Sequence, residues 1–249
     1  MSGAWQVRRL AVCASTEQEL ERWLQAKPPP EAPGWRRMMV ARRQRFGRGQ
    51  QGRVWQSPAG GLWLSAAFPW PEDPATTAAP QLAMALGLAL ELEQLGGDGR
   101  TVPVAIKWPN DLYLDGRKLA GLLPRLRLRG GRVRWAQLGL GLNGINRVPP
   151  GAVALAEAFQ PPPGRTARRF DPRATPRALE ALARRAIERT LALVDQPERV
   201  RQWAEQRLWM PSRDIVRDGL LWRIDGLECD GGLRVCGPNG RRDIWRRDF

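Results

Sequence analysis

The sequence predicts an α+β protein. We expect a central mixed, mostly antiparallel sheet flanked by helices, followed by a small C-terminal β-barrel. Short segments with strand-like alternation recur between residues 5 and 142, and two long helical patterns lie at 80–95 and 175–194. From about residue 212, short β-like pieces alternate with glycine, aspartate and asparagine turns. We therefore expect a large domain at 1–211 and a small β domain at 212–249.

The first part of the chain is predicted to alternate strands and helices. The expected elements are a strand at 5–13, a helix at 16–26, a strand at 37–43, a glycine-rich loop at 47–61, a strand at 61–68 and a helix at 80–95. Thr16 and Glu19 have the T-x-x-E spacing of a capping box, so we expect Thr16 to begin the first helix as its cap. Gly96 and Gly97 are typical of a helix C-terminus.

A run of β signals follows, and then two helices. The predicted strands are 102–108, 112–114, 118–129 and 132–142, and the predicted helices are 175–194 and 197–208. Asp115-Gly116 and Gly130-Gly131 are turn pairs typical of hairpins, so neighbouring strands should pair antiparallel. A loop rich in proline and arginine is expected at 160–174.

Composition excludes several kinds of chemistry. The chain has no histidine, which excludes a Ser-His-Asp triad, a Cys-His dyad and histidine-held metals. Its three cysteines, Cys13, Cys229 and Cys236, match no zinc or redox spacing, and we expect reduced thiols and no metal held by the protein alone. Neither a signal peptide nor a membrane span is apparent, so we expect a cytoplasmic protein.

The basic residues are numerous and unevenly chosen. The formal net charge is +15, which favours an acidic partner, although an arginine-rich composition without any such partner explains it equally well. Lys27, Lys107 and Lys118 are the only lysines among 40 basic residues. Two of them, with Asn110, Asn143 and Asn146, lie in one region. A compact ammonium in place of a guanidinium indicates a candidate site at 107–146.

Residues 45–53 form the first candidate motif. Gly47, Gly49 and Gly52 allow the backbone to approach a ligand closely, and Arg48 and Arg53 supply forked donors for phosphate or carboxylate. The segment is neither a P-loop nor a dinucleotide-binding fingerprint. A basic hairpin loop is the alternative.

Three further segments carry candidate groups. Lys107-Trp108-Pro109-Asn110-Asp111 precedes the Asp115-Gly116 turn, which returns Lys118 toward Asp111, unless Asp111 is an ordinary turn residue. Gly139 and Gly141 alternate in a strand, where they permit close approach of a ligand or relieve packing. Ser15 and Thr16 can hydrogen-bond a polar ligand or simply cap the helix.

Taken together and in this order, these segments resemble the biotin–protein ligase family. The resemblance covers most of 10–146, and its KWPND segment with the downstream Lys118-Leu119-Ala120-Gly121 is the most specific part. It implies a C-terminal domain that is SH3-like. It also implies activation of biotin with ATP to biotinyl-5′-adenylate and transfer to a lysine of the biotin carboxyl carrier domain of acetyl-CoA carboxylase. Mg²⁺ would accompany ATP.

The resemblance also assigns roles to residues. The implied catalytic residues are Lys118, Asp111 and Arg48. The implied biotin-binding residues are Ser15, Thr16, Gln44, Gly47, Arg48, Gly49, Gln50, Lys118, Gly139 and Gly141. The implied ATP-binding residues are Arg48, Arg53, Lys107, Asn110, Lys118 and Asn143. Trp55 is expected to help form an apolar slot for the biotin tail.

Two positions depart from the family pattern. Gln50 stands where the family usually has an arginine, which implies weaker retention of the adenylate, and Glu17 replaces the asparagine of its STN triplet. No helix-turn-helix precedes Trp5, so we expect no specific DNA binding. A homodimer is left open. The alternatives are a ligase for lipoate or octanoate on the same fold, and a basic nucleic-acid-binding module.

Overall fold

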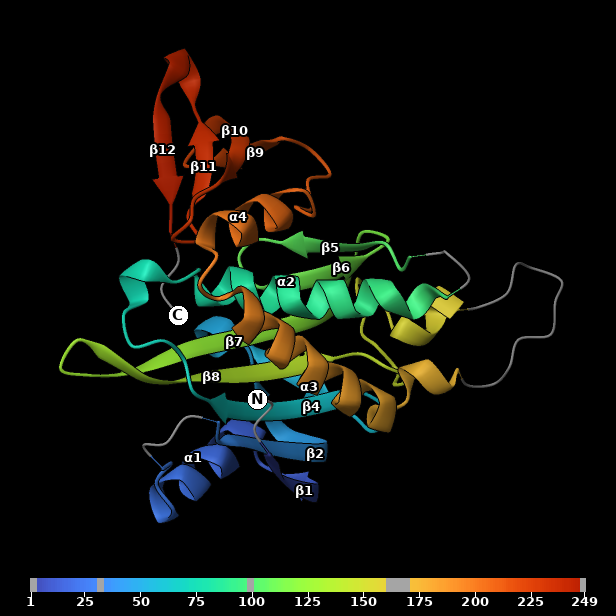
Figure 1. Cartoon of the computed structure of the whole chain (residues 1–249). Coiled ribbons are helices and arrows are strands. Elements are labelled where there is room, and N and C mark those ends of the chain that lie inside the picture. The colour runs from blue at the N-terminus through green and yellow to red at the C-terminus, as the bar shows by residue number, and fades with distance from the viewer. Residues whose placement is uncertain (1–3, 31–33, 98–100, 160–170, 247–249) are drawn as a thin grey trace, which may run out of the picture.

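The computed structural model describes residues 4–30, 34–97, 101–159 and 171–246. Its helices and strands are β1 (Trp5–Cys13), α1 (Thr16–Ala26), β2 (Arg36–Arg48), β3 (Val54–Ser57), β4 (Leu62–Phe68), α2 (Pro80–Glu93), β5 (Val104–Lys107), β6 (Asp111–Leu114), β7 (Arg117–Arg129), β8 (Arg132–Leu142), α3 (Pro176–Leu193), α4 (Pro197–Glu205), β9 (Asp214–Arg217), β10 (Leu220–Leu227), β11 (Leu233–Cys236) and β12 (Arg242–Trp245). Figure 1 shows the main sheet at the centre and the small sheet at one end, beyond α4.

The main sheet is mixed and mostly antiparallel, as predicted. Its strand order is β1-β2-β4-β8-β7-β6-β5, with β3 paired to β2. β1 and β2 run parallel, whereas the other neighbours are antiparallel. The long hairpin of β7 and β8 lies in the middle of this order, so both strands can contribute to a site on the sheet.

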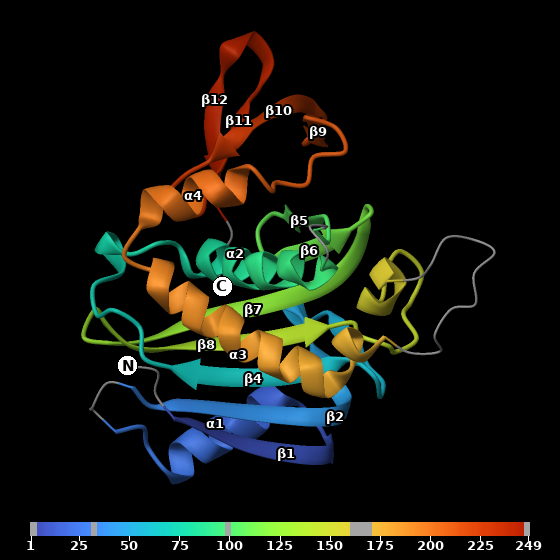
Figure 2. The same ribbon diagram turned by 45° about the vertical axis from the view of Figure 1, so that its right-hand side comes forward.

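Alternate residues of β4 face two different layers of helix. Leu62, Leu64 and Phe68 of β4 belong to the large core that also contains α2 and α3, whereas Ala67 belongs to a smaller core with α1. In Figures 1 and 2, α2 and α3 cross the sheet beside β7, β8 and β4. Because α1 packs against β2 and β4, the same face over β8, β7 and β6 is left for a ligand.

The C-terminal strands form a second, antiparallel sheet with the order β12-β11-β10-β9. This agrees with the predicted small β domain, while its boundary at 211/212 remains a prediction. Leu227, Leu233 and Val235 are buried in the same large core as α2, so the small sheet packs against the rest of the molecule. None of the described helices is long and apolar enough to cross a membrane.

Several predicted boundaries differ from those observed. The glycine-rich loop predicted at 47–61 includes the end of β2, a 3₁₀ turn (Gln50–Gly52) and β3, because pairing between β2 and β3 extends the sheet beyond the local pattern. The last helix ends at Glu205 rather than at 208. Within the loop predicted at 160–174, a 3₁₀ turn (Pro172–Ala174) is observed, and 160–170 lie outside the described residues.

The capping prediction for the first helix was wrong by one residue. Ser15 is the N-cap, with an extended backbone and with its Oγ accepting a hydrogen bond from Glu17 N at 3.3 Å. Thr16 is already helical, and its hydroxyl points to Gln44 and Ser65 instead. The side chain that the sequence assigned to helix capping is therefore directed into the interior.

Candidate active site

One row of residues crosses five neighbouring strands and forms the floor of the candidate site. The pairing register joins Trp63 on β4 to Gly141 on β8, then to Gly121 on β7, Asp111 on β6 and Lys107 on β5. Residues that are directly opposite each other in antiparallel strands point to the same face. The row therefore places two glycines between a buried indole and a pair of charged side chains.

A β-bulge brings Lys118 to this face. The register of β6 and β7 shifts between Leu112 and Tyr113, so that Tyr113 lies opposite Lys118. Leu119 and Ala120 are consequently both buried in the core, and Lys118 points to the same side as Asp111. Bulges commonly re-aim a side chain in this way next to active sites. Lys118 Nζ lies 2.6 Å from Asp111 Oδ2.

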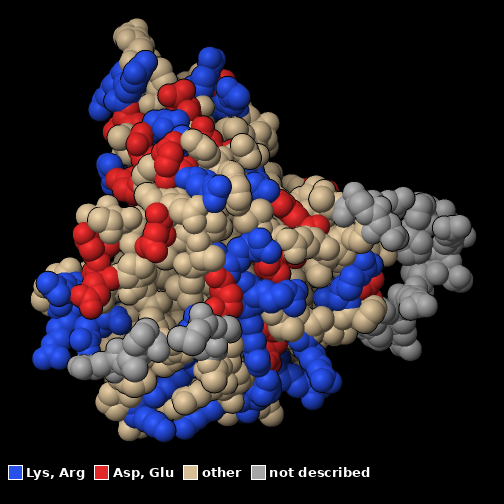
Figure 3. Space-filling model, in the orientation of Figure 1, with Lys and Arg blue, Asp and Glu red and all other residues tan. Residues whose placement is uncertain are grey.

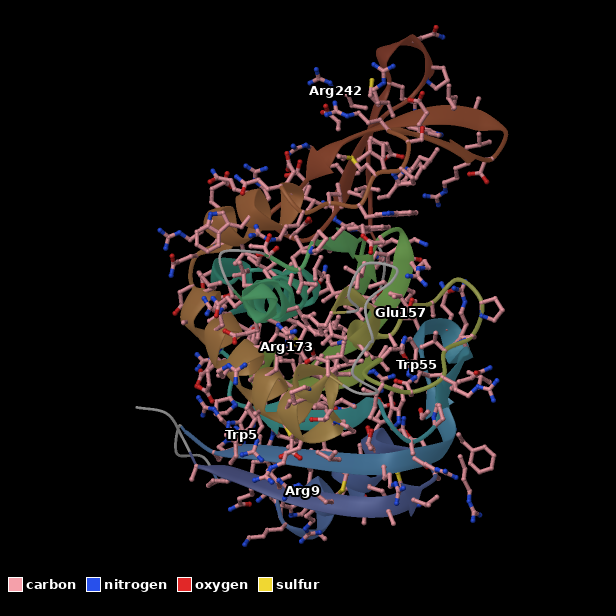
Figure 4. All side chains as sticks on the ribbon, turned by 90° about the vertical axis from the view of Figure 1, so that its right-hand side faces the viewer. Trp5, Arg9, Trp55, Glu157, Arg173 and Arg242 are labelled. Carbon is pink, nitrogen blue, oxygen red and sulfur yellow. The ribbon has the colours of Figure 1, made fainter. Side chains whose placement is uncertain are left out.

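Trp55 lies across the two glycines. A Cβ at Gly141 would stand 2.4 Å from Trp55 Cε2, and a Cβ at Gly121 would stand 2.8 Å from Trp55 Cζ3. The ring also makes an edge contact with Trp63, and the Lys118 ammonium lies 5.0 Å from its centroid. Figure 4 shows Trp55 in the main part of the molecule, well away from Arg242 on the small sheet. Gly121 and Gly141 thus make room for an aromatic wall beside the charged pair.

The opposite end of the site is polar and buried. Thr16 donates to Gln44 Oε1 from both its backbone N, at 2.8 Å, and its Oγ1, at 3.0 Å. Gln44 Nε2 in turn donates to Ser57 Oγ at 2.8 Å, and the hydroxyls of Thr16 and Ser65 are 2.9 Å apart. Ser65 was missed by the sequence prediction, although it is the single polar residue within the apolar strand β4. It pairs with Gly139, which completes a second row next to the first.

The glycine-rich loop closes one side of the site. Gly49 N donates to Arg53 O at 2.7 Å, and Arg53 N donates to Gln50 O at 3.1 Å, which forms a tight turn. Gly47 plays a different part, because a Cβ there would lie 2.4 Å from Trp55 O, so a glycine is required for β2 and β3 to approach. The loop carries Arg48 and Arg53 at the edge of the site.

The asparagines and Lys107 are held by local contacts. Asn110 donates to Leu122 O, and Asn143 Oδ1 accepts from Asn146 at 3.1 Å. Lys107 Nζ donates to the hydroxyl of Tyr113 at 2.9 Å. The side chains of Asn110, Asn143 and Lys107 are therefore held in place around the pair of Lys118 and Asp111.

These side chains surround one cavity of about 430 Å³, a size typical of small-molecule sites. The predicted site residues that line it are Ser15, Thr16, Gln44, Arg48, Gly49, Gln50, Arg53, Lys107, Asn110, Asp111, Lys118, Gly139, Gly141 and Asn143. Of the predicted set, Gly47 does not line it. Glu17, Ser65 and Trp108 line it in addition.

The sequence has known relatives that share this region. A family model described as the biotin/lipoate A/B protein ligase family matches residues 12–143. The biotin–[acetyl-CoA-carboxylase] ligase of Paracoccus denitrificans is 33% identical over 217 residues, which are 83% of this chain and 86% of that protein. The chain belongs to the biotin/lipoate A/B protein ligase family.

Other relatives match a shorter stretch. The bifunctional ligase/repressor BirA of Escherichia coli is 40% identical over 105 residues, which are 42% of this chain and 32% of BirA. This chain therefore matches about a third of the length of such bifunctional relatives.

Solved structures agree on the fold. A biotin protein ligase from Aquifex aeolicus in complex with biotin and ATP has a TM-score of 0.63 at 23% identity, covering 97% of this chain and 99% of that one. The biotin acetyl coenzyme A carboxylase synthetase of Helicobacter pylori has a TM-score of 0.52 at 22% identity, covering 97% of this chain and 100% of that one. The fold of these two solved structures thus extends over nearly the whole chain, including the small sheet.

Proposed function

We propose that this protein activates biotin with ATP to biotinyl-5′-adenylate and transfers the biotinyl group to a lysine of the biotin carboxyl carrier domain of acetyl-CoA carboxylase. The observation that carries the proposal is the single cavity that joins a buried hydrogen-bonding end, at Thr16, Gln44 and Ser65, to the Lys118–Asp111 pair. Membership of the family and the carboxylase ligase of Paracoccus denitrificans support it.

The separation of the two ends supports a ligand with a polar head and a carboxylate tail. Ser65 is on β4 and Lys118 is on β7, with β8 between them. Two strand spacings amount to about 10 Å. The Lys118–Asp111 pair lies in the row of Gly121 and Gly141, two residues along the strands from the row of Ser65 and Gly139, so the slot runs obliquely over the sheet. The ureido ring of biotin would bind at the Thr16 end, with Ser15 and Gln44, and its apolar chain would lie along Trp55 and the strip of Gly139 and Gly141. Its carboxylate would then reach Lys118.

The first step is an attack by the carboxylate of biotin on the α-phosphorus of ATP. The bond from that phosphorus to the bridging oxygen breaks, and pyrophosphate leaves with the electron pair. Lys118 would neutralise charge that develops on the carboxyl and the α-phosphate, and Arg48 would close over the adenylate. Arg53, Lys107, Asn110 and Asn143 would hold the nucleotide, which requires positioning rather than an enzyme nucleophile.

In the second step, the amine of the carrier lysine attacks the acyl carbon, and AMP leaves. The proton that the amine loses would pass to the phosphate of the departing AMP, because the chain contains no histidine to accept it. Asp111 would orient Lys118 and the incoming amine, since its carboxylate lies 2.6 Å from Lys118 Nζ. We therefore assign the catalytic roles to Lys118, Asp111 and Arg48.

The carboxylates that line the cavity fit a Mg²⁺ ion that binds together with ATP. Among the described residues, Asp111 and Glu17 are the carboxylates that line the cavity, and no cluster of three or more metal-ligating side chains is found. Mg²⁺ is commonly held by one or two carboxylates together with substrate phosphates. Asp111 would supply the protein ligand, and the ion would offset phosphate charge.

A ligase for lipoate or octanoate is the second candidate, because the matching family includes such enzymes. The buried end of the cavity disfavours it. Thr16, Gln44 and Ser65 already bond to one another and to Ser57, but an apolar acyl chain would offer nothing to their remaining donors and acceptors, which a ureido ring could use.

The test is exchange of labelled pyrophosphate into ATP by the purified protein with Mg²⁺. We expect exchange that requires biotin and is not supported by lipoate or octanoate. Exchange with lipoate alone would move the assignment to the second candidate. A folded protein that catalyses no exchange with any of the three acids would refute the ligase proposal.

Two further properties belong to the proposal. The described cysteines Cys13, Cys229 and Cys236 are all free thiols, which supports a reducing, cytoplasmic setting. A homodimer is compatible with the exposed edge strand β1, and sedimentation velocity over a range of concentrations would decide between monomer and dimer.

A further inference from the structure

The outer edge of β5 is covered by the segment that leads to the small sheet. Ile106 N donates to Arg207 O at 2.7 Å, and Trp209 N donates to Ile106 O at 2.8 Å. These bonds form a parallel bridge between Ile106 and Leu208. In Figures 1 and 2, β5 accordingly lies beside α4, on the side of the main sheet nearest to the small sheet. The chain between α4 and β9 is therefore attached to the strand that ends at Lys107.

This bridge directs Trp209 to the same face of the sheet as Lys107. Ile106 is buried in the large core, and Leu208 packs against that core. Successive residues of a strand point to opposite faces, and residues opposite each other in neighbouring strands share a face. Lys107 and Trp209, which follow Ile106 and Leu208, therefore both point to the face of the candidate site.

The ammonium of Lys107 is held by two aromatic rings. Its Nζ lies 4.9 Å from the centroid of the Tyr113 ring and 5.3 Å from the centroid of the Trp209 ring, both within the range of a cation–π interaction. The two rings contact each other, with centroids 4.7 Å apart. Tyr113 is the only tyrosine in the chain, and its hydroxyl accepts a hydrogen bond from the same Nζ. Two rings and one hydroxyl thus fix this side chain.

In the part of the chain that the structure describes, no carboxylate forms an ion pair with Lys107. Asp111, directly opposite on β6, pairs with Lys118 instead. Lys107 lines the active-site cavity, whereas neither Tyr113 nor Trp209 is among the described residues that line it. The aromatic pair therefore orders the ammonium and leaves its charge for an anionic ligand, which a carboxylate partner would partly cancel.

We propose that Trp209, together with Tyr113, is a positioning residue that holds the Lys107 ammonium at the wall of the cavity before ATP binds. This inference rests on the proposed function for the identity of the nucleotide. Lysine has a flexible four-carbon stem and loses much rotamer freedom when its ammonium is fixed. Because the two rings fix it in advance, that loss does not oppose the binding of ATP.

A purely structural role for the Trp209 ring makes a different prediction. A ring that only packed against β5 would affect ATP and biotin alike, and it would do so with or without Lys107. Trp203 of α4 is a matched control, because it is also partly buried and has Arg199 over its ring, 5.2 Å from the centroid. Neither Trp203 nor Arg199 is among the described residues that line the cavity.

The experiment measures the binding of ATP with Mg²⁺, and separately of biotin, by isothermal titration. We expect Trp209→Leu to weaken ATP binding about fivefold or more, as for the loss of a cation–π contact, and to leave biotin binding within about twofold. Trp209→Phe, which keeps a ring, should recover most of the ATP affinity. Trp203→Leu should change neither affinity.

A double-mutant cycle shows whether Trp209 acts through Lys107. Lys107→Met should weaken ATP binding by itself, and adding Trp209→Leu to it should cause no further loss. If Trp209→Leu does not fold, Tyr113→Phe takes its place in the cycle, because it removes only the hydroxyl. That variant should weaken ATP binding about threefold or more, and again only when Lys107 is present.

Several results would overturn the inference. Normal ATP binding by Trp209→Leu, equal losses for ATP and biotin, or a loss that persists beside Lys107→Met would each do so. These outcomes are separate from the fate of the ligase proposal. If ATP binding changes as expected but biotin supports no pyrophosphate exchange in the wild type, the role of Trp209 stands and the proposed ligase activity fails.

Discussion

At the scale of single residues, Lys118 owes its place to one irregularity in a strand. The bulge in β7 buries two consecutive residues, Leu119 and Ala120, and thereby turns Lys118 toward Asp111. A hairpin around Asp115-Gly116 could be predicted from the sequence, and so could the approach of Lys118 to Asp111. The bulge could not, because it follows from the demand of the core for both apolar side chains.

Replacing Lys118 tests its chemical role. Lys118→Ala should reduce biotin-dependent pyrophosphate exchange by on the order of 100-fold or more, because it removes the cation next to the reacting carboxyl. The melting temperature should change little, because Lys118 is partly exposed. Lys27→Ala, at the exposed end of α1, is the control. Wild-type exchange by Lys118→Ala would contradict the assignment.

The glycines of β8 were ambiguous in the sequence, and the structure resolves one of them. Gly139 and Gly141 were equally compatible with ligand approach and with relief of packing. At Gly141 the neighbour is the Trp55 ring, 2.4 Å from the position of a Cβ, whereas the nearest atom at Gly139 is Leu123 Cβ at 3.2 Å. Only the pairing of distant strands places that ring, so no local pattern predicts it.

A methyl group at Gly141 should collide with Trp55. We expect Gly141→Ala to lower the free energy of unfolding by about 1–3 kcal/mol, the usual cost of overpacking. In a Trp55→Ala background the same substitution should cost much less, because the ring that it meets is absent. Urea unfolding of the four proteins gives the coupling energy. Additive effects would show that the two residues do not press on each other.

At the scale of elements, α3 is tied to the edge strand β1 through one carboxylate. Glu180 accepts two hydrogen bonds from Arg9, at 2.6 and 3.0 Å, and another from Arg184. Burial raises the pKa of Glu180, but the bonds and charges of Arg9 and Arg184 outweigh it and hold that pKa below its ordinary value of 4.5. Arg9 is labelled on β1 in Figure 4.

This lowered pKa predicts how stability depends on pH. A carboxyl with a lowered pKa in the folded state stabilises the protein fully above its unfolded value of 4.5, and that contribution is lost as the pH falls through the folded value. Urea midpoints between about pH 7 and pH 3 should therefore fall more for the wild type than for Glu180→Gln.

The control is Glu72→Gln, because the Arg132–Glu72 pair is exposed and such pairs contribute little. It should follow the wild-type profile. A wild-type curve parallel to that of Glu180→Gln would mean that the contacts of this carboxylate do not stabilise the fold.

At the scale of the whole molecule, the presence of the main sheet, the helices and the small sheet could be predicted from the sequence. Which helix packs on which face of the main sheet could not. The mixed sheet, its helices and the small β sheet follow from periodicity and turn residues. That α1 and the pair α2–α3 cover opposite faces depends on which alternate side chains of β4 face each layer. Ser65 is an example: its strand was predicted, yet its place beside Thr16 depends on contacts 49 residues apart.

The basic residues behind the net charge of +15 are spread over many elements of the structure. Figure 3 shows basic side chains on the N-terminal elements and on the small sheet of the face that it draws, interleaved with acidic ones. Many arginines are engaged in internal pairs, such as Arg36 with Glu188 and Arg207 with Glu93. These pairs are neutral, so they explain part of the number of arginines but not the surplus of +15, which consists of the basic residues in excess of the 25 acidic ones.

The small sheet is predicted to unfold together with the main domain. Trp222, Leu227 and Leu233 belong to the same core as α2, and Trp108, next to the candidate site, donates to Gly231 O at 2.8 Å. Calorimetry should therefore show a single transition, which biotin raises by mass action if it binds. Two transitions in the wild type would contradict a shared core.

Glu205 offers a way to weaken this coupling. Its Oε2 accepts a hydrogen bond from Leu227 N at 2.9 Å and pairs with Arg201 at 2.9 Å, so it links α4 to β10. Glu205→Ala leaves a half-buried backbone N–H without its partner, which costs roughly 1–3 kcal/mol. We expect that loss to appear as a separate, earlier transition of the small sheet, because α4 remains attached to α2 through Val200 and Ala204. A uniform shift of one transition would instead show that the apolar contacts alone couple the two sheets.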